Sequence, residues 1–342
     1  MINVGVIGYG YWGPNLVRNF HETSGAQMKA VCDLDPRRLS LALKRYPTLQ
    51  TTTDHRELLK DPAIDVIAIA TPVAAHFPLA KDALKAGKHV LLEKPLTQST
   101  EQALRLLEEA AKRNLTVMVD HTFIYTPAVR KMKELVAGGS LGEVYYYDST
   151  RINLGLFQSD VNVIWDLAAH DVSILDYLFE DKPCAVSATG ISHVPGSPES
   201  MAYLTVFFES NLIAHMHVNW LAPVKLRRTL LGASKKMLVY DDLEPSEKIK
   251  VYDKGITLKD NVEGVHQLLI GYRSGDMWAP NLPLTEALRT EAEHLVHCLE
   301  NGERPMTDGA AGLRVVQILE AATRSVRLQG QPVELDARRK AA

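Results

Sequence analysis

Three residues that can transfer protons stand out along the chain: Lys94, Asp166 and His170. Asp166 and His170 are four residues apart, so in a helix they lie on one face and can approach the same group. A histidine titrates near neutral pH and can relay a proton, while an aspartate can orient the histidine or a substrate. The same spacing is also common on ordinary helix surfaces, so the pair gains meaning only from its surroundings.

Lys94 belongs to Glu93-Lys94-Pro95, which directly follows the apolar run Val90 to Leu92. If that run is a parallel strand, Glu93 and Lys94 lie at its carboxyl end, where open α/β sheets bind their ligands. Pro95 has no amide donor and restrains the turn. A lysine held there can exchange a proton with a substrate, whereas in an ordinary loop it is a solvated surface charge.

A glycine-rich loop precedes these residues. Gly8, Gly10 and Gly13 form a full GxGxxG between the apolar run Val4 to Ile7 and a helical segment over Asn15 to Phe20. In this context the glycines permit a tight turn, a close backbone approach to a pyrophosphate, and packing of the helix on the strand. We expect the loop, with Tyr11 and Trp12, to bind a dinucleotide at the helix N-terminus.

Asp33 follows the last glycine of the loop by 20 residues, at the end of the run Met28 to Cys32. A carboxylate there accepts hydrogen bonds from the adenine ribose and repels a 2′-phosphate, which favours NAD over NADP. Arg37 and Arg38 oppose this preference, because an arginine can accommodate that phosphate. Another apolar run ends at Thr71-Pro72, so we expect these two residues and His76 at the same coenzyme crevice.

The elements that must position these residues form two patterns. Up to residue 121, short uniformly apolar runs alternate with helical segments, which predicts a doubly wound parallel sheet. Helix starts are expected at Asp54 and at Ser99, where Gln102 completes a capping box. Beyond that point few helices separate the strand-like runs, so a second domain over residues 122–342 should hold a largely antiparallel sheet. Its strands are predicted at 185–191, 202–208, 212–220, 227–231 and 237–240, and its helices at 128–136, 166–179, 286–299 and 312–328.

Composition restricts the class of protein. Of 342 residues, 46% are hydrophobic and 23% are charged, with a net charge of −3, as in soluble globular proteins without a general attraction for nucleic acid or acidic membranes. The three cysteines are far apart, which indicates a reducing compartment, and we expect a cytoplasmic protein. No apolar run approaches the roughly 18 residues of a membrane span. The chain lacks HExxH, clustered cysteines and GxSxG, so we expect neither a metal site nor serine hydrolase chemistry.

The ordered set of motifs resembles the Gfo/Idh/MocA oxidoreductases. The motifs are GVIGYGYWGPN at 5–15, Asp33, ATPVAAH at 70–76, EKP at 93–95 and DLAAHD at 166–171. The resemblance implies a Rossmann domain followed by an α/β domain with a large open sheet that is often used for oligomerisation, here a homodimer or homotetramer. It also implies a pyridine nucleotide, no metal, and sugar or cyclitol substrates. It assigns catalysis to Lys94, Asp166 and His170, and places Thr71-Pro72 near the nicotinamide.

A closer resemblance is to a branch carrying GYWGPN, HTFIYTPAVRK at 121–131 and RINLGLFQSDVNVIWDLAAHD at 151–171. This branch is similar to bacterial nucleotide-sugar dehydrogenases, including those that oxidise the 3-hydroxyl of UDP-N-acetylglucosamine. Ala169 stands where the family often has glycine, so the substrate pocket can differ from that of inositol dehydrogenases. Substrate contacts are predicted for Tyr125, Arg151, Asn153, Asp166 and His170. Lys225, Arg227 and Arg228 are candidates for binding a diphosphate, and Tyr125 or Trp220 for stacking on a base.

Three other functions remain open on the sequence. One is an inositol or free-sugar dehydrogenase, and another is an NAD-dependent glycosidase on the same scaffold. The third is a nucleotide-binding sensor without catalysis, which the joint presence of the lysine, aspartate and histidine argues against. The sequence also leaves open whether Lys94 or His170 accepts the hydroxyl proton, and in which direction the reaction runs.

Overall fold

The computed structural model describes residues 1–155, 161–259 and 269–335, and its internal contacts divide the chain into two compact units. The first unit comprises Met1–Thr126 and Thr285–Gln317, and the second comprises Pro127–Leu284 and Ile318–Ala342. The sequence predicted one boundary, with all residues from 122 onward in the second domain. The structure differs because helix α8 (Ala287–Asn301) packs against β1, α1 and η2 of the first unit.

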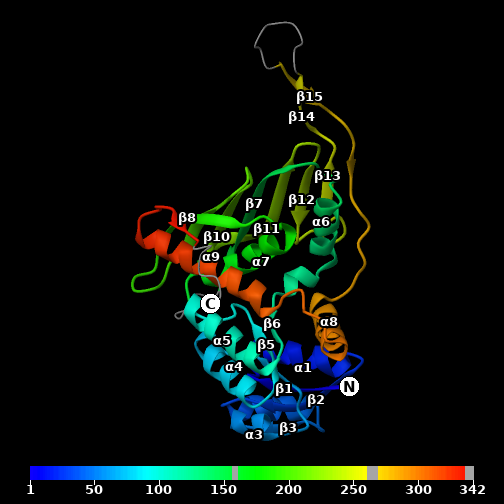
Figure 1. Ribbon diagram of the computed structural model, residues 1–342, viewed down its shortest axis with the longest axis vertical. Coiled ribbons are helices and arrows are strands. Elements are labelled where there is room, and N and C mark those ends of the chain that lie inside the picture. Colours follow the sequence, from blue (N-terminus) through cyan, green and yellow to red (C-terminus); the bar gives the residue numbers. More distant parts are fainter. Residues whose placement is uncertain (156–160, 260–268, 336–342) are drawn as a thin grey trace. The chain divides into compact units, whose positions relative to one another are not determined.

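The first unit contains a parallel sheet of six strands in the order β3-β2-β1-β4-β5-β6 (Figure 1). The predicted doubly wound sheet is therefore confirmed. The strands are β1 (Ile2–Ile7), β2 (Ala26–Cys32), β3 (Gln50–Thr52), β4 (Val66–Ile69), β5 (His89–Glu93) and β6 (Val117–Asp120). All four residues of β4 and of β6 are buried, because helices cover both faces of the sheet.

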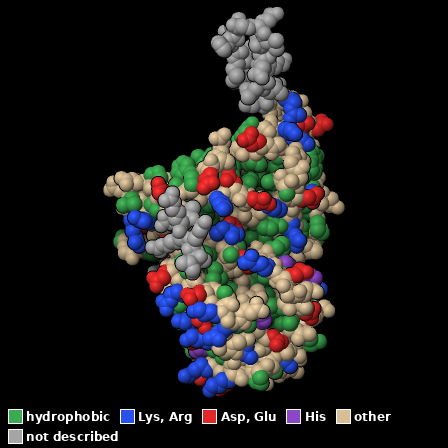
Figure 2. Space-filling model, in the orientation of Figure 1, with side chains coloured by type: hydrophobic (Ala, Val, Ile, Leu, Met, Phe, Trp, Pro, Cys, Tyr) green, Lys and Arg blue, Asp and Glu red, His purple; other side chains and the backbone are tan. Residues whose placement is uncertain are grey.

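Two helices of the first unit begin at the side-chain caps that the sequence predicted. Asp54 accepts from the amide of Arg56, and Ser99 from the amide of Gln102. The main helices are α1 (Gly13–Glu22), α2 (Pro36–Arg45), α3 (His55–Lys60), α4 (His76–Lys85), α5 (Thr100–Arg113) and α8. Short 3-10 turns cover η1 (Val73–Ala75) and η2 (Thr122–Tyr125). Basic side chains gather over α4 and α5 (Figure 2), where several pair with glutamates one turn away, as on a solvated helix face.

The second unit is built on a nine-stranded sheet in the order β16-β13-β12-β11-β7-β10-β9-β8-β17. Its pairings are antiparallel except that of β7 with β10, so the predicted mostly antiparallel sheet is confirmed. The strands are β7 (Val144–Leu154), β8 (Pro183–Ile191), β9 (Met201–Phe208), β10 (Ile213–Asn219), β11 (Leu221–Ala233), β12 (Met237–Asp241), β13 (Ile249–Tyr252), β16 (Met277–Trp278) and β17 (Val333–Glu334). A separate hairpin joins β14 (Gly255–Lys259) to β15 (Leu269–Arg273).

Helices cover one face of the nine-stranded sheet (Figure 1). They are α6 (Pro127–Ala137), the π-helical turn η3 (Ile164–Ala168), α7 (Ala169–Leu178) and the second part of α9 (Gly309–Arg327). Along β10 the predicted alternation holds, because Ala214, Met216 and Val218 are fully buried while Ile213 is 43% exposed. The opposite face also exposes Tyr203, which stacks on His217 with 4.5 Å between ring centroids. No helix among the described residues covers this second face (Figure 1).

Candidate active site

The glycine loop after β1 has no room for side chains at two of its glycines. Gly8 has φ of +99°, and a Cβ there would lie 2.4 Å from the carbonyl oxygen of Ala70. A Cβ on Gly13 would lie 2.0 Å from the carbonyl oxygen of Gly8. The chain thus turns sharply from β1 into α1, whose N-terminus has no side-chain cap. Free amides at an uncapped helix start, reached over a glycine backbone, fit the phosphates of a dinucleotide.

Asp33, at the end of β2, is 6% exposed and holds the glycine loop. Its Oδ2 accepts from the amide of Tyr9 at 2.7 Å, and its Oδ1 accepts from the amide of Asp35 at 2.8 Å. Nη1 of Arg38 lies 3.4 Å from Oδ2, while Arg37 pairs with Asp35. The carboxylate therefore stands beside the loop at the strand end, as a ribose-binding acid must.

Two other side chains of the loop differ in what they contact. Tyr11 is 89% exposed. Trp12 is partly buried, and its indole Nε1 donates to Oδ2 of Asp120 at 2.6 Å. Asp120 is the last residue of β6, in register with Glu93 at the end of β5. The loop is thus tied to a strand that the sequence analysis did not connect with the site.

His76 joins the loops that follow β4 and β5. It is 1% exposed, with Nε2 2.9 Å from the carbonyl oxygen of Thr71 and Nδ1 2.9 Å from that of Pro95. Burial lowers the pKa of His76 despite these carbonyl acceptors, so the imidazole is neutral at pH 7 and donates to one of them. His76 is thus buried and links Thr71-Pro72 to Lys94-Pro95, and its predicted contact with the coenzyme stays a prediction. The Lys94-Pro95 peptide bond is cis.

Buried polar atoms without protein partners occur at the same edge of the sheet. Among the residues that the structure describes, the Thr71 hydroxyl and both ring nitrogens of His121 have no hydrogen-bond partner. Burial, assisted by the Lys94 charge, lowers the pKa of His121 to about 3. The sequence did not predict His121 and Asp120 as site residues, although β6 also ends at this edge of the sheet. Unpaired polar atoms beside the glycine loop are consistent with a polar ligand binding there.

Asp166 and His170 lie in the second unit, on successive turns of η3 and α7. The sequence predicted one regular helix over 166–179, whereas Asp166 lies in a π-helical turn, a feature frequent at functional sites. Trp220 is 1% exposed, and its Nε1 donates to Oδ2 of Asp166 at 3.0 Å. The suggested base-stacking role does not suit this tryptophan, because its ring is packed and its N–H orients Asp166.

Arg151 and Tyr125 were predicted to contact substrate, and the structure buries both. Arg151 is 3% exposed and donates through Nε and Nη2 to the two carboxylate oxygens of Asp171, at 2.8 and 3.2 Å. Tyr125 is 1% exposed, and its hydroxyl lies 3.0 Å from that of Thr307. These placements indicate packing roles, because neither side chain reaches the surface. Asn153 remains partly exposed near the end of β7, and residues 156–160 of the branch motif lie outside the described residues.

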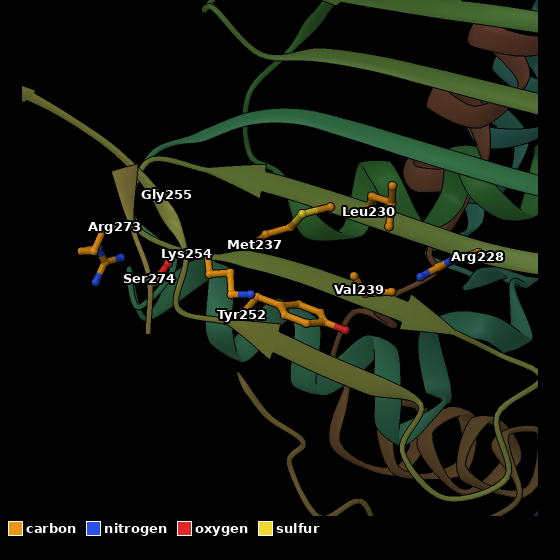
Figure 3. Close-up of a pocket in the computed structure, with 9 residues that line it drawn as sticks. All are labelled: Arg228, Leu230, Met237, Val239, Tyr252, Lys254, Gly255, Arg273 and Ser274. Carbon is orange, nitrogen blue, oxygen red and sulfur yellow. The ribbon is translucent and has the colours of Figure 1, made fainter. Parts of the chain in front are cut away.

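The basic residues proposed for a diphosphate are divided between two faces of the sheet. Arg227 pairs with Asp242 on the helix-covered side, where its register partner is Arg151. Arg228 instead lines a groove of about 690 Å³ on the uncovered side, with Leu230, Met237, Val239 and Tyr252 as its apolar floor. Figure 3 shows Arg228 at one end of this groove, Lys254 and Arg273 at the other, and the Tyr252 ring between them. Adjacent strand residues point to opposite faces, so the trio cannot converge on one ligand.

Two other features bear on the class of protein, a metal centre and a membrane-spanning helix. Across residues 1–155, 161–259 and 269–335, no group of three or more His, Cys, Asp or Glu side chains is arranged to hold a metal ion. Over those same ranges, no helix has the length and apolar character to cross a membrane. The free cysteines are Cys32, Cys184 and Cys298.

Comparison with known proteins supports the interpretation of both units. A family model described as "Oxidoreductase family, NAD-binding Rossmann fold" matches residues 2–121, and the GFO/IDH/MocA C-terminal domain model matches residues 129–239. UDP-N-acetylglucosamine 3-dehydrogenase of Acidithiobacillus ferrooxidans is 25% identical, over 92% of this chain and 94% of that protein. Its solved structure superposes with a TM-score of 0.82, covering 96% of this chain and 98% of that one.

Other relatives act on different molecules. The scyllo-inositol 2-dehydrogenase (NAD(+)) of Bacillus subtilis is 24% identical over 99% of this chain and 96% of its own. Levoglucosan dehydrogenase, solved with NADH and levoglucosan, has a TM-score of 0.83 at 20% identity, with 98% of this chain and 99% of that chain covered, and so shows the shared fold. The two family models together match well over half of the residues. The glycine loop and the two-unit architecture agree with them. The chain belongs to the Gfo/Idh/MocA family of NAD(P)-dependent oxidoreductases.

Proposed function

We propose that this enzyme oxidises a secondary alcohol of a nucleotide-linked sugar, with UDP-N-acetylglucosamine and its 3-hydroxyl as the first candidates. The observation that carries this proposal is the nearly full-length similarity to UDP-N-acetylglucosamine 3-dehydrogenase in both sequence and fold. The basic trio no longer supports it, because its members lie on opposite faces of the sheet. The nucleotide part of the proposal therefore rests on the similarity.

NAD is the proposed coenzyme, in preference to NADP. Gly8, Gly10 and Gly13 would admit its pyrophosphate, and Asp33 would accept hydrogen bonds from the adenine ribose. The Asp33 carboxylate is fixed by two backbone amides, so it would not easily turn away from a 2′-phosphate. When bound, the nicotinamide supplies the acceptor or donor of hydride.

The proton chemistry is assigned to Lys94, Asp166 and His170. Lys94 or His170 would take the hydroxyl proton, and Asp166 would orient the reacting alcohol or the histidine. The Trp220 indole restrains Asp166, and the Arg151–Asp171 pair restrains the start of α7, where His170 lies. Ketone reduction would use the same groups in reverse, since one set of groups serves both directions of a proton transfer.

A substrate panel tests the proposal. Purified enzyme with NAD is offered UDP-sugars, dTDP-sugars, free sugars and inositols, and the absorbance of NADH is followed. A parallel set includes an α-keto acid, which re-oxidises tightly held NADH and reveals hidden turnover. We expect the highest kcat/KM on a UDP-linked N-acetylhexosamine, with Lys94→Met as the inactive control.

The other possible results each identify a different function. Turnover of inositol or a free sugar, with none on any nucleotide sugar, would refute the substrate proposal and leave the dehydrogenase mechanism. Release of a sugar leaving group without net NADH would identify a glycosidase. Binding of NAD without turnover of any panel member would favour a sensor.

A further inference from the structure

The contact between Trp12 and Asp120 links distant parts of the first unit. Trp12 follows β1, whereas Asp120 ends β6, and β4 and β5 stand between those two strands in the sheet. Neighbouring strands are about 4.8 Å apart, so the contact bridges roughly 14 Å along the edge of the sheet. The indole and its carboxylate partner therefore pass the carboxyl ends of β4 and β5, from which Thr71 and Lys94 follow.

Asp120 is a buried residue, and both of its carboxylate oxygens accept hydrogen bonds. It is 1% exposed, and its second oxygen, Oδ1, accepts from the hydroxyl of Thr122 at 2.5 Å. Glu291 of α8 is fully buried beside it. Burial, and then the neighbouring Asp120 charge, raises the pKa of Glu291 well above its ordinary value. The raised pKa favours the neutral form of Glu291, which adds no second negative charge next to Asp120.

We propose that Asp120 is a positioning residue that fixes the Trp12 indole as a wall at the nicotinamide end of the coenzyme crevice. A ring held by a 2.6 Å hydrogen bond has already lost its rotational freedom before the coenzyme binds. The flat apolar surface it offers suits a planar ring, and water is kept from that side. This inference rests on the proposed use of NAD.

The test measures NADH affinity without any substrate, through the fluorescence of the coenzyme itself. The variants are Asp120→Ala, Asp120→Asn, Trp12→Phe and the double variant Trp12→Phe/Asp120→Ala. Asp82→Ala, on the exposed side of α4, is the matched control. We expect Asp120→Ala and Trp12→Phe each to weaken NADH binding about ten-fold, as the loss of one orienting hydrogen bond predicts.

Two further results separate positioning from a general structural role. Asp120→Asn should bind NADH nearly as the wild type does, because its amide oxygen still accepts from the indole. The double variant should be no weaker than either single variant, since the carboxylate acts through the ring. Thermal unfolding of each variant checks the fold. If Asp120→Ala does not fold, the contrast between a weakened Trp12→Phe and a normal Asp120→Asn carries the test.

Failure of this inference is distinguishable from failure of the proposed function. If the wild type binds NADH and Asp120→Ala binds it equally well, the inference is wrong while the coenzyme assignment stands. Additive losses in the double variant would also overturn it, because the two residues would then act independently. A wild type that binds neither NAD nor NADH would overturn the proposed function, and this inference with it.

Discussion

Removing the carboxylate of Asp171 should destabilise the second unit strongly. The Asp171 and Arg151 side chains are each 4% exposed and share two hydrogen bonds, at 2.8 and 3.2 Å. At 2.8 Å, with an effective dielectric constant of about 20, the attraction between the two charges is about 6 kcal/mol. Part of it offsets the loss of hydration of both groups. In Asp171→Ala the guanidinium still loses its hydration but no longer gains the attraction to a carboxylate. We therefore expect the free energy of unfolding to fall by about 3–5 kcal/mol.

The chain offers a matched control in the Arg105–Glu101 pair, whose side chains are 53% and 79% exposed at 3.6 Å. Glu101→Ala should cost about 0–1 kcal/mol, because water already screens those charges. Replacing both buried partners, as in Arg151→Met/Asp171→Leu, should recover most of the stability lost in Asp171→Ala, since no unpaired charge stays buried.

Urea unfolding followed by tryptophan fluorescence measures these differences. Trp165, Trp220 and Trp278 lie in the second unit and Trp12 in the first, so the fluorescence reports mainly the unit that contains the ion pair, and far-ultraviolet circular dichroism also follows the first unit, which contains the control pair. Asp171→Ala should also lower kcat, because His170 precedes the residue that ties α7 to β7. If the free energy of unfolding of Asp171→Ala falls by less than about 1 kcal/mol, as in Glu101→Ala, the claim that the Arg151–Asp171 pair restrains α7 is refuted.

Four further predictions concern other parts of the molecule. Glu291 has a raised pKa in the folded state, so the stability that its proton contributes is present below its ordinary pKa of 4.5 and is lost as pH rises. Glu291→Gln should therefore gain stability over the wild type in urea melts from about pH 4.5 upward. Parallel pH profiles of the two proteins would contradict this. Lys94→Met should lower kcat by about 10²–10⁴ and leave the Kd for NAD nearly unchanged, whereas a near-normal kcat removes it from the mechanism. Asp33→Asn should shift the NAD to NADP affinity ratio toward NADP in paired titrations, and a wild type that prefers NADP would contradict the coenzyme assignment. We also propose a homodimer or homotetramer through the uncovered sheet face. The mass from light scattering should therefore exceed the 37.9 kDa of one chain and should fall in Ile213→Asp. A wild-type mass of 37.9 kDa would oppose assembly.

Regular elements were predictable because their burial repeats with a fixed period. Val66–Ile69 and Val117–Asp120 are strands buried on both faces, which a continuous apolar run indicates directly. The alternation along β10 likewise separated buried from exposed positions. Helix α8 shows where this reasoning ends: its apolar stripe indicates that it packs on something, and says nothing about which sheet. Its return to the first unit, and the burial of Glu291 that results, come from long-range packing.

The coenzyme loop was predictable for a local reason, since its glycines, strand, helix and acid all lie within residues 2–33. Substrate contacts were also predicted for Tyr125 and Arg151, and the structure buries both, so their contact with a substrate stays a prediction. Closeness along the chain does not say which way a side chain points, whereas the partners that bury these two residues, Thr307 and Asp171, lie 182 and 20 residues away. The partner of Trp12 is 108 residues away, so no local pattern connects it with Asp120.

The contacts that orient the candidate site residues each lie within one compact unit. Trp12 with Asp120, and His76 with the carbonyls of Thr71 and Pro95, belong to the first unit; Trp220 with Asp166, and Arg151 with Asp171, belong to the second. The proposed catalytic residues of each unit are therefore positioned by contacts within that unit. If the second unit binds the alcohol, as we propose, substitutions there would change the alcohol that is accepted without disturbing the glycine loop, because the orienting contacts of the loop come from strands of the first unit. This independence gives a physical reason why relatives of similar fold carry names as different as scyllo-inositol 2-dehydrogenase and UDP-N-acetylglucosamine 3-dehydrogenase.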